Sequence, residues 1–336
     1  MKQMNKNNHF IFRALKTLVI PVAVYLLFTI ISGGVFGNAN VMITVLKNVC
    51  EGAILAWALM IIMITGMLDM SIGAAAILGA IIGGSIAKAN GFGMAGWVIC
   101  IILSCMVISM VTACAVIFTK LPSMVVTLGL VLVYEALTIM VNDSKGISTT
   151  YLGLATVPAC YIVFLICACI VVFIMHFTKS GNQLRALGSD QANAATMGLN
   201  VRKIKFKAFL ISGFLVGVAS VMMLSYNSKL SSAENMSSVA RVFTALMAVV
   251  IGQFLSRNCD QILATFIGAF VMKMMASGLL SLGISATWQN VCIGIFLLVF
   301  MSISTNQERV NQYFSNRRRA RAIMESMENR EGGVKV

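Results

Sequence analysis

The sequence predicts an all-α integral membrane protein with about ten transmembrane helices and with its amino and carboxyl ends on the cytoplasmic side. The chain is 59% hydrophobic with a mean hydropathy of +0.92, whereas soluble domains are about 45–50% apolar. Only 11% of the residues are charged, so one compact core cannot bury the apolar surface. The apolar runs are long and continuous, which favours spanning helices over a barrel of short alternating strands.

The apolar runs define ten segments of roughly spanning length. They lie near residues 15–36, 45–65, 71–88, 95–118, 123–141, 157–177, 206–226, 239–255, 261–281 and 286–304. The first run follows basic residues, as a signal peptide would, but it continues to Phe36 without a clear small-residue cleavage site. We therefore expect it to be a retained span.

The net charge of +14 is concentrated outside the apolar runs. The segments 2–16 and 178–207 and the tail after 305 hold 17 of the 25 basic residues. Ten crossings from an inside start place all three segments on one side, as the positive-inside rule requires. This distribution indicates a multi-pass protein of the plasma (inner) membrane, in contact with lipid and not with nucleic acid.

The predicted organisation is one transmembrane domain, 15–304, between a cytoplasmic amino-terminal tail, 1–14, and a basic cytoplasmic tail, 305–336. Neither tail nor any loop is long enough to form a further domain. The chain has no phosphate-binding G-x-x-x-x-G-K-[ST] motif and only two histidines, His9 and His176. Its nine cysteines have no zinc-ligand spacing. We expect no enzyme activity and no cofactor in this chain, so any ATP use belongs to a partner.

The inside segment 178–205 carries the clearest local signal. Ser189 or Asp190 can cap a short helix, alanines favour it, and Gly198 can end it in the left-handed conformation. The small residues Gly188, Asp190, Ala194, Ala195 and Gly198 suit a helix that sits in a groove of a moving partner. The other interpretation is an ordinary amphipathic surface loop.

Four polar residues lie within or beside apolar segments: Asp69, Ser71, Glu135 and Lys273. Charged groups in a membrane should face protein or water, so all four are candidates for a translocation path or gate. Glu135 and Lys273 could pair with each other. Alternatively, Asp69 and Ser71 cap the following helix, Lys273 extends towards an interface, and Glu135 faces the bundle.

Four motifs resemble permeases of the ribose-type (simple-sugar) ABC importer family. The segment from Thr178 to Val201 is similar to the family's cytoplasmic loop. The strings T-G-M-L-D-M-S-I-G at 65–73, L-P-S-M-V-V-T-L-G at 121–129 and W-Q-N-V-C-I-G at 288–294 follow the family's order. One departure is 252–260, where the family carries a glycine-rich turn, so the chain resembles a diverged member.

The resemblance implies a transmembrane permease subunit that moves a simple sugar or related small polar solute. It implies a cytoplasmic ABC ATPase bound at 178–205, an external solute-binding protein, and a second permease copy or a sister permease. ATP would then be used only by the partner subunit. A nucleoside or branched-chain amino-acid ABC permease remains an alternative. An ion-coupled secondary transporter, and a membrane scaffold that does not transport, are alternatives from other classes.

Overall fold

The computed structural model describes residues 2–141, 145–149, 157–256 and 259–305. It divides into two compact parts, one up to Gln289 and one from Asn290. The helices are α1 (Lys2–Ile31), α2 (Ala39–Ile64), α3 (Ile72–Ala89), α4 (Met94–Thr119), α5 (Ser123–Met140), α6 (Val157–Phe177), α7 (Lys179–Ser189), α8 (Gln191–Thr196), α9 (Val201–Asn227), α10 (Val239–Leu255), α11 (Gln261–Ser281) and α12 (Ala286–Thr305). The strands β1 (Ile147–Ser148) and β2 (Lys229–Leu230) form a short antiparallel pair.

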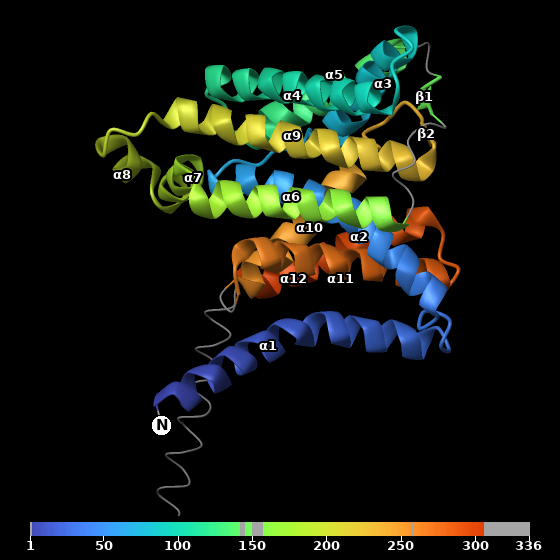
Figure 1. Ribbon diagram of the computed structural model, residues 1–336, viewed down its shortest axis with the longest axis vertical. Coiled ribbons are helices and arrows are strands. Elements are labelled where there is room, and N and C mark those ends of the chain that lie inside the picture. Colours follow the sequence, from blue (N-terminus) through green and yellow to red (C-terminus); the bar gives the residue numbers. More distant parts are fainter. Residues whose placement is uncertain (1, 142–144, 150–156, 257–258, 306–336) are drawn as a thin grey trace, which may run out of the picture. The chain divides into compact units, whose positions relative to one another are not determined.

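Each of the ten predicted segments coincides with a long helix (Figure 1). Seven of the described helices are long and apolar enough to cross a membrane: α2, α3, α4, α5, α6, α9 and α11. The apolar helices Thr17–Ile31 and Val239–Leu255 are shorter. The helix α1 begins at Lys2, so most of the segment 1–14, predicted as a cytoplasmic tail, is helical. No glycine or proline interrupts the chain before Pro21, so the helix continues through the polar residues. The tail from 306 lies outside the described residues.

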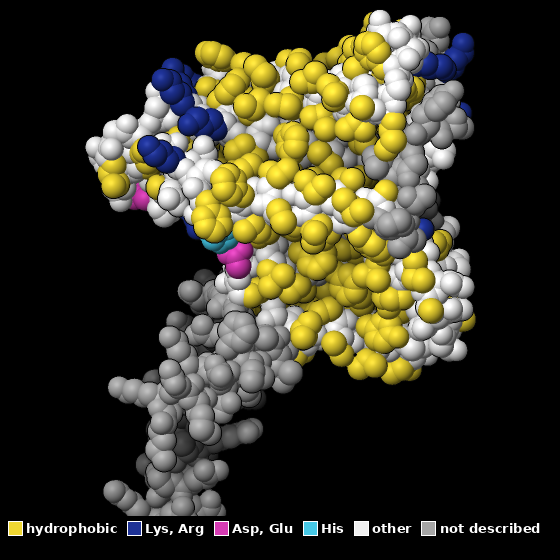
Figure 2. Space-filling model, viewed as in Figure 1, with side chains coloured by type: hydrophobic (Ala, Val, Ile, Leu, Met, Phe, Trp, Pro, Cys, Tyr) yellow, Lys and Arg dark blue, Asp and Glu magenta, His cyan; other side chains and the backbone are white. Residues whose placement is uncertain are grey.

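The central helices of the first part are α2 and α9, which pack against each other. Their middles are almost wholly buried, and the indole N–H of Trp57 on α2 donates to the carbonyl of Ile262 on α11 over 3.0 Å. The peripheral helices instead expose apolar stripes, such as Leu165 and Phe173 on α6. Hydrophobic side chains cover much of the visible face in Figure 2. Such large apolar surfaces fit contact with lipid.

Three successive helices are repeated in an inverted arrangement that the sequence does not reveal. The first set is α2, α3 and α4, with 26, 18 and 26 residues, and the second is α9, α10 and α11, with 27, 17 and 21. In the first set α3 packs on α4 and on α9, and in the second set α10 packs on α11 and on α2. Because α2 and α9 run in opposite directions (Figure 1), the repeat is inverted.

Small residues allow the close packing of α4 between α3 and α9. A Cβ atom added at Gly83 on α3 would lie 2.5 Å from the Cα of Ile101. One added at Gly217 on α9 would lie 2.7 Å from the Cα of Ile102. Both glycines belong to small-xxx-small patterns, which let helix backbones approach closely in membranes.

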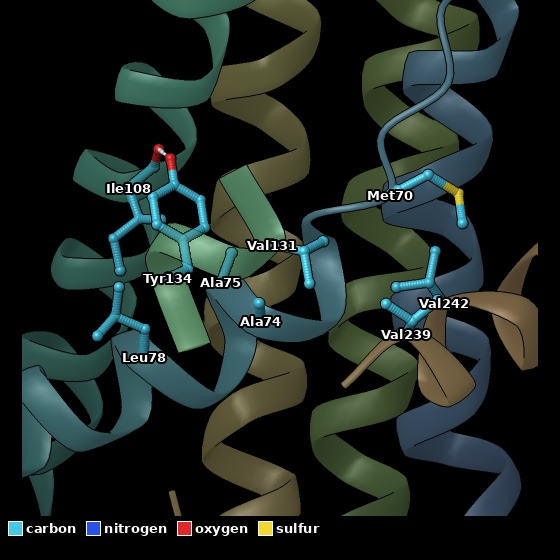
Figure 3. Close-up of a cluster of buried hydrophobic side chains, with 9 residues drawn as sticks. All are labelled: Met70, Ala74, Ala75, Leu78, Ile108, Val131, Tyr134, Val239 and Val242. Carbon is cyan, nitrogen blue, oxygen red and sulfur yellow. Dashed lines mark hydrogen bonds between the residues drawn. The ribbon is translucent and has the colours of Figure 1, made fainter. Parts of the chain in front are cut away.

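The first turns of the two short helices, α3 and α10, meet inside the first part of the chain. A Cβ atom at Gly73 would overlap the carbonyl oxygen of Ser238, so the backbones touch there. An apolar cluster surrounds this contact, and Figure 3 shows Met70 beside Val239 and Val242. We call the contact between residues 71–73 and residues 238–239 the helix-start crossing.

Candidate functional site: a coupling segment and a polar helix crossing

The segment 178–200 folds into two short helices, α7 and α8, and we call it the coupling segment after its expected role. Thr178 caps α7 by accepting from the N–H of Gly181 over 3.3 Å. Asp190 caps α8 by accepting from the N–H groups of Ala192 and Asn193, at 2.8 and 3.1 Å. Gly198 follows with φ of +81°. The predicted cap at Asp190 and the predicted left-handed stop at Gly198 are therefore confirmed, whereas α7 was not foreseen.

The helix α7 rests directly on the last turn of α2. A Cβ atom at Gly188 would overlap the carbonyl oxygen of Ile64. Leu184, one turn before Gly188, and Leu187, directly before it, are also buried. Gly188 is thus needed for the approach of α7 to α2, and the coupling segment is fixed to the bundle and not loosely attached.

The two alanines proposed to contact a partner differ in exposure. Ala194 is only 2% exposed, so its side chain is covered by the rest of the chain. Ala195 is exposed, and Met197, just after α8, is 80% exposed. The prediction that Ala194 contacts a partner is therefore corrected, because six residues of helix cannot show from spacing alone which side faces the bundle. Ala195 and Met197 form the accessible apolar face.

The connection 65–71 between α2 and α3 is held by polar groups of α5. Ser123 Oγ accepts from the N–H of Leu68, and Thr127 Oγ1 accepts from the N–H of Met70, each over 3.0 Å. These residues belong to the motifs at 65–73 and 121–129. With Gly188 against Ile64, three of the four motifs meet at this connection. The fourth motif, 288–294, crosses the boundary between the two parts of the chain.

Asp69 and Ser71 form a local turn before α3. The Oδ1 atom of Asp69 accepts from Ser71 N–H over 2.8 Å and from Ser71 Oγ over 2.6 Å. Ser71 occupies the N-cap position, but its own side chain makes no cap bond. Both side chains are buried. The predicted cap by Asp69 and Ser71 is therefore not formed as expected: Asp69 holds the residue at the N-cap position, and neither side chain is shown bonding to an N–H within α3.

Burial raises the pKa of Asp69 to about 6 from 3.8, although its bonds to Ser71 act in the opposite direction. Below about pH 3 the carboxyl group is protonated in both the folded and the unfolded chain, and its contribution to stability is fully present. That contribution, about 3 kcal/mol, is lost as the pH rises through 6.

We therefore expect the stability difference between wild type and Asp69→Asn to depend on pH. Asparagine keeps the acceptor oxygen but does not titrate. Between pH 3 and pH 7 the wild type should lose about 3 kcal/mol relative to the variant, measured by equilibrium unfolding in detergent micelles. Parallel stability curves would show that the pKa of Asp69 is unchanged by folding.

Glu135 holds the start of α10. Its Oε1 accepts from Ser238 N–H over 2.9 Å and from Ser238 Oγ over 2.5 Å, and its Oε2 accepts from the N–H of Met236 over 2.7 Å. Glu135 is 3% exposed. The predicted pairing of Glu135 with Lys273 is wrong, because both carboxylate oxygens are engaged with the connection before α10.

The helices α3 and α10 therefore begin in the same way. Each has a serine at the N-cap position without a side-chain cap bond. In each case the N–H and the hydroxyl of that serine both donate to one buried carboxylate. Asp69 and Glu135 thus fix the two sides of the helix-start crossing. Local sequence patterns could not indicate the role of Ser238, because its partner Glu135 is 103 residues away in the chain.

Lys273 lies instead at a polar cavity between α2, α9, α10 and α11. The cavity has a volume of about 220 Å³, and its lining includes Glu51, Asn227, Arg241 and Lys273. A second cavity of about 460 Å³ shares Asn227 and Arg241 and reaches the β2 strand and the serines after it. Together they form a polar recess that opens at the β1–β2 end. Spacing alone could not have grouped Glu51, Asn227 and Arg241 with Lys273.

The altered segment 252–260 is joined to the coupling segment by polar contacts. Asp260 caps α11 by accepting from the N–H of Ile262 over 3.1 Å. Its Oδ1 also lies 3.1 Å from Nε2 of His176, at the end of α6, and Arg185 on α7 lies 3.4 Å from the same nitrogen. Residues 257–258 are outside the described part. Polar contacts thus link this departure from the family pattern to α7.

Within the described residues, no group of three or more histidine, cysteine or acidic side chains is arranged to hold a metal ion. All nine cysteines are free thiols.

Comparison with known proteins identifies the family. A family model described as "Branched-chain amino acid transport system / permease component" matches residues 41–301. The protein named "Probable ABC transporter permease protein YphD" of Escherichia coli is 26% identical over 84% of this chain and 86% of its own length. The fructose import permease protein FrcC of Rhizobium meliloti is 23% identical over 89% and 88%.

The ribose import permease protein RbsC of Escherichia coli strain K12 is 24% identical over 81% of this chain and 88% of its own length. A solved ABC transporter of metal-chelate type, in an inward-facing conformation, has a TM-score of 0.47 and 13% identity, and the match covers 86% of this chain and 99% of that chain. The family model and the relatives named for sugar import confirm the resemblance to ABC importer permeases, and the chain belongs to the family of branched-chain amino acid transport permease components, as a diverged member.

Proposed function

We propose that this permease imports a simple sugar or a related small polar solute, driven by an ATPase on another chain. The observation that carries this proposal is the match over most of the chain to permeases named for ribose and fructose import. In this proposal all ten long helices, α1 to α6 and α9 to α12, cross the plasma membrane. Both chain ends and the α7–α8 segment then lie in the cytoplasm, as the three basic segments favour.

The polar recess is the proposed entry for solute. It offers donors and acceptors on Asn227, Thr244 and three serines of the 228–238 connection. Such groups can replace the water bound to a sugar. An external binding protein would dock at this end, near 37–43 and 227–238 and at 142–156, of which 142–144 and 150–156 lie outside the described residues.

The helix-start crossing is the proposed gate of the path. Asp69, Ser71 and Glu135 lie at the crossing and not on the walls of the recess, so we assign them the positioning of α3 and α10. Movement of these short helices would open or close the path, with a second copy of this chain or a sister permease completing it. ATP binding drives the change only if the ATPase binds the two states with different affinity.

The proposed ATPase contact is α8 and the residues directly after it. Ala195 and Met197 present a small apolar face at the end opposite the recess, and Asp190 and Gly198 fix its ends. Because α7 packs on α2, a force on α8 reaches the central helices directly.

A branched-chain amino acid is the second candidate solute. The family description names this class, and the inner cavity holds one carboxylate, Glu51, with two cations, Arg241 and Lys273. Groups of both signs could bind the ammonium and carboxylate ends of a zwitterion.

Reconstitution with the cognate ATPase and binding protein tests the proposed function. We expect ATP-dependent uptake of a labelled sugar, measured in proteoliposomes with ribose, fructose, a nucleoside and leucine in parallel. The substitution Ala195→Arg should release the ATPase and reduce uptake at least about tenfold, because it places a long charged side chain in a small-residue interface.

Ala95→Arg is the matched control, since Ala95 is exposed near the start of α4, at the other end of the bundle. It should leave ATPase binding unchanged. Uptake of leucine alone would support the amino-acid candidate. Uptake driven by an ion gradient without ATP, or a stable complex without any flux, would contradict the importer proposal.

A further inference from the structure

A basic pocket lies at the end of the bundle that carries α8. It has a volume of about 340 Å³ and is lined by the last turn of α4, the first residues of α5 and α9, and the connection 65–71. Three cations line it, Lys120, Arg202 and Lys205, and its lining contains no carboxylate. Figure 2 shows Lys and Arg side chains gathered over this end of the molecule.

The cations oppose the ordinary charge preference of a helix start. The first turn of α9 contains no acidic residue and instead carries Arg202, with Lys205 just beyond it. Positive side chains near the positive end of a helix dipole are unfavourable. The start of α5 adds a second such end, where Pro122 provides no side-chain cap. An anion bound here would interact favourably with both helix starts and all three cations.

The positive-inside rule alone does not account for this arrangement. Lys203 and Lys207 on the same helix satisfy that rule, are exposed and do not line the pocket. The pocket cations are distinguished by their place around a concavity. Lys120 is held there by a left-handed backbone with φ of +56°, which costs a non-glycine residue free energy.

The surface beside the pocket is apolar and exposed. Phe118 is 76% exposed, Leu121 56% and Val125 60%. Phe118 lies in the last turn of α4, Leu121 in the connection to α5, and Val125 in the first turn of α5. Both helices are candidate spans, so these side chains offer a surface for acyl chains next to the cations. A free phosphate would contact only the cations. A phospholipid would contact the cations with its headgroup and the apolar side chains with its acyl chains.

We propose that the basic pocket binds the phosphate headgroup of an anionic phospholipid, with its acyl chains along the exposed apolar residues of α4 and α5. The bound lipid contacts the start of α9, which directly follows α8, and the connection 65–71. It is therefore placed to influence the coupling segment. The site does not depend on which solute is transported.

Lipid binding to the purified full-length chain in detergent tests this site. The probe is phosphatidylglycerol, measured by native mass spectrometry against phosphatidylcholine with the same acyl chains. The test variant combines Lys120→Asn, Arg202→Gln and Lys205→Gln, with asparagine at 120 because it tolerates the left-handed backbone. Each basic group near an anionic headgroup contributes roughly fivefold in affinity, so we expect about a 100-fold loss of phosphatidylglycerol binding.

The charge-matched control combines Lys179→Gln, Lys203→Gln and Lys207→Gln, which are exposed and lie outside the pocket. It should change phosphatidylglycerol binding less than about twofold. Equal losses in both variants, no preference over phosphatidylcholine, or full competition by soluble glycerol phosphate would each overturn the proposal. If the triple variant does not fold, Lys120→Asn alone should weaken binding about fivefold and Lys203→Gln should not.

Discussion

Gly188→Ala is expected to displace α7 from α2 and to destabilise the permease by about 2–3 kcal/mol. The added methyl group would overlap the carbonyl oxygen of Ile64, and a backbone carbonyl at a helix end cannot rotate away as a side chain can. Because α8 follows α7 directly, the ATPase should also be released. Equilibrium unfolding in detergent and co-purification of the ATPase measure the two effects.

Gly129→Ala is the matched control for this experiment. Gly129 lies within α5 and has no atom within 4 Å of an added Cβ. Alanine is favoured over glycine inside a helix by about 1 kcal/mol, so this variant should be more stable than wild type. If both glycine substitutions shifted stability in the same direction, the close packing of α7 on α2 would be contradicted.

Glu135→Ala is expected to cost about 3–5 kcal/mol, because it leaves two backbone N–H groups and a hydroxyl without their acceptor. The start of α10 would lose its anchor on α5, and uptake should fall with stability. The stability of Glu135→Gln should lie between those of wild type and Glu135→Ala, since its one carbonyl oxygen can still accept from Ser238. The free energy of unfolding and the uptake rate should be measured on the same preparations.

The control for this substitution is Glu234→Ala. Glu234 lies in the same connection as Met236 and Ser238 but is exposed, so its removal should change stability by less than about 0.5 kcal/mol. In a double-mutant cycle, Glu135→Ala and Ser238→Ala should be strongly non-additive. Additive effects would show that the carboxylate stabilises α10 by some other contact.

The helices were largely predictable because their signal is local. A long apolar run in a membrane has few alternatives to a helix, and all ten segments coincide with helices to within a few residues at most ends. The helix α7 was missed because it is polar overall, although Thr178 as a cap and the buried pair Leu184 and Leu187 carried a weak signal. The strands β1 and β2 have two residues each and no sequence signal.

The site was predictable only where its contacts are local. Asp190 caps a helix two and three residues away, and Asp69 binds a serine two residues away, so spacing was enough. The partner of Glu135 and the neighbours of Lys273 depend on which helices pack together, and charge alone wrongly suggested that these two residues pair. The exposure of Ala195 and the burial of Ala194 likewise depend on the rotation of α8.

The two carboxylates of the helix-start crossing also differ in when they can be satisfied during biosynthesis. Asp69 meets its donors as soon as α3 begins, because Ser71 is two residues away. Glu135 leaves the ribosome 101 and 103 residues before Met236 and Ser238, which supply its donors. Until α9 and the connection before α10 are inserted, the carboxylate lacks these donors, so the order of synthesis leaves the crossing open until late in assembly.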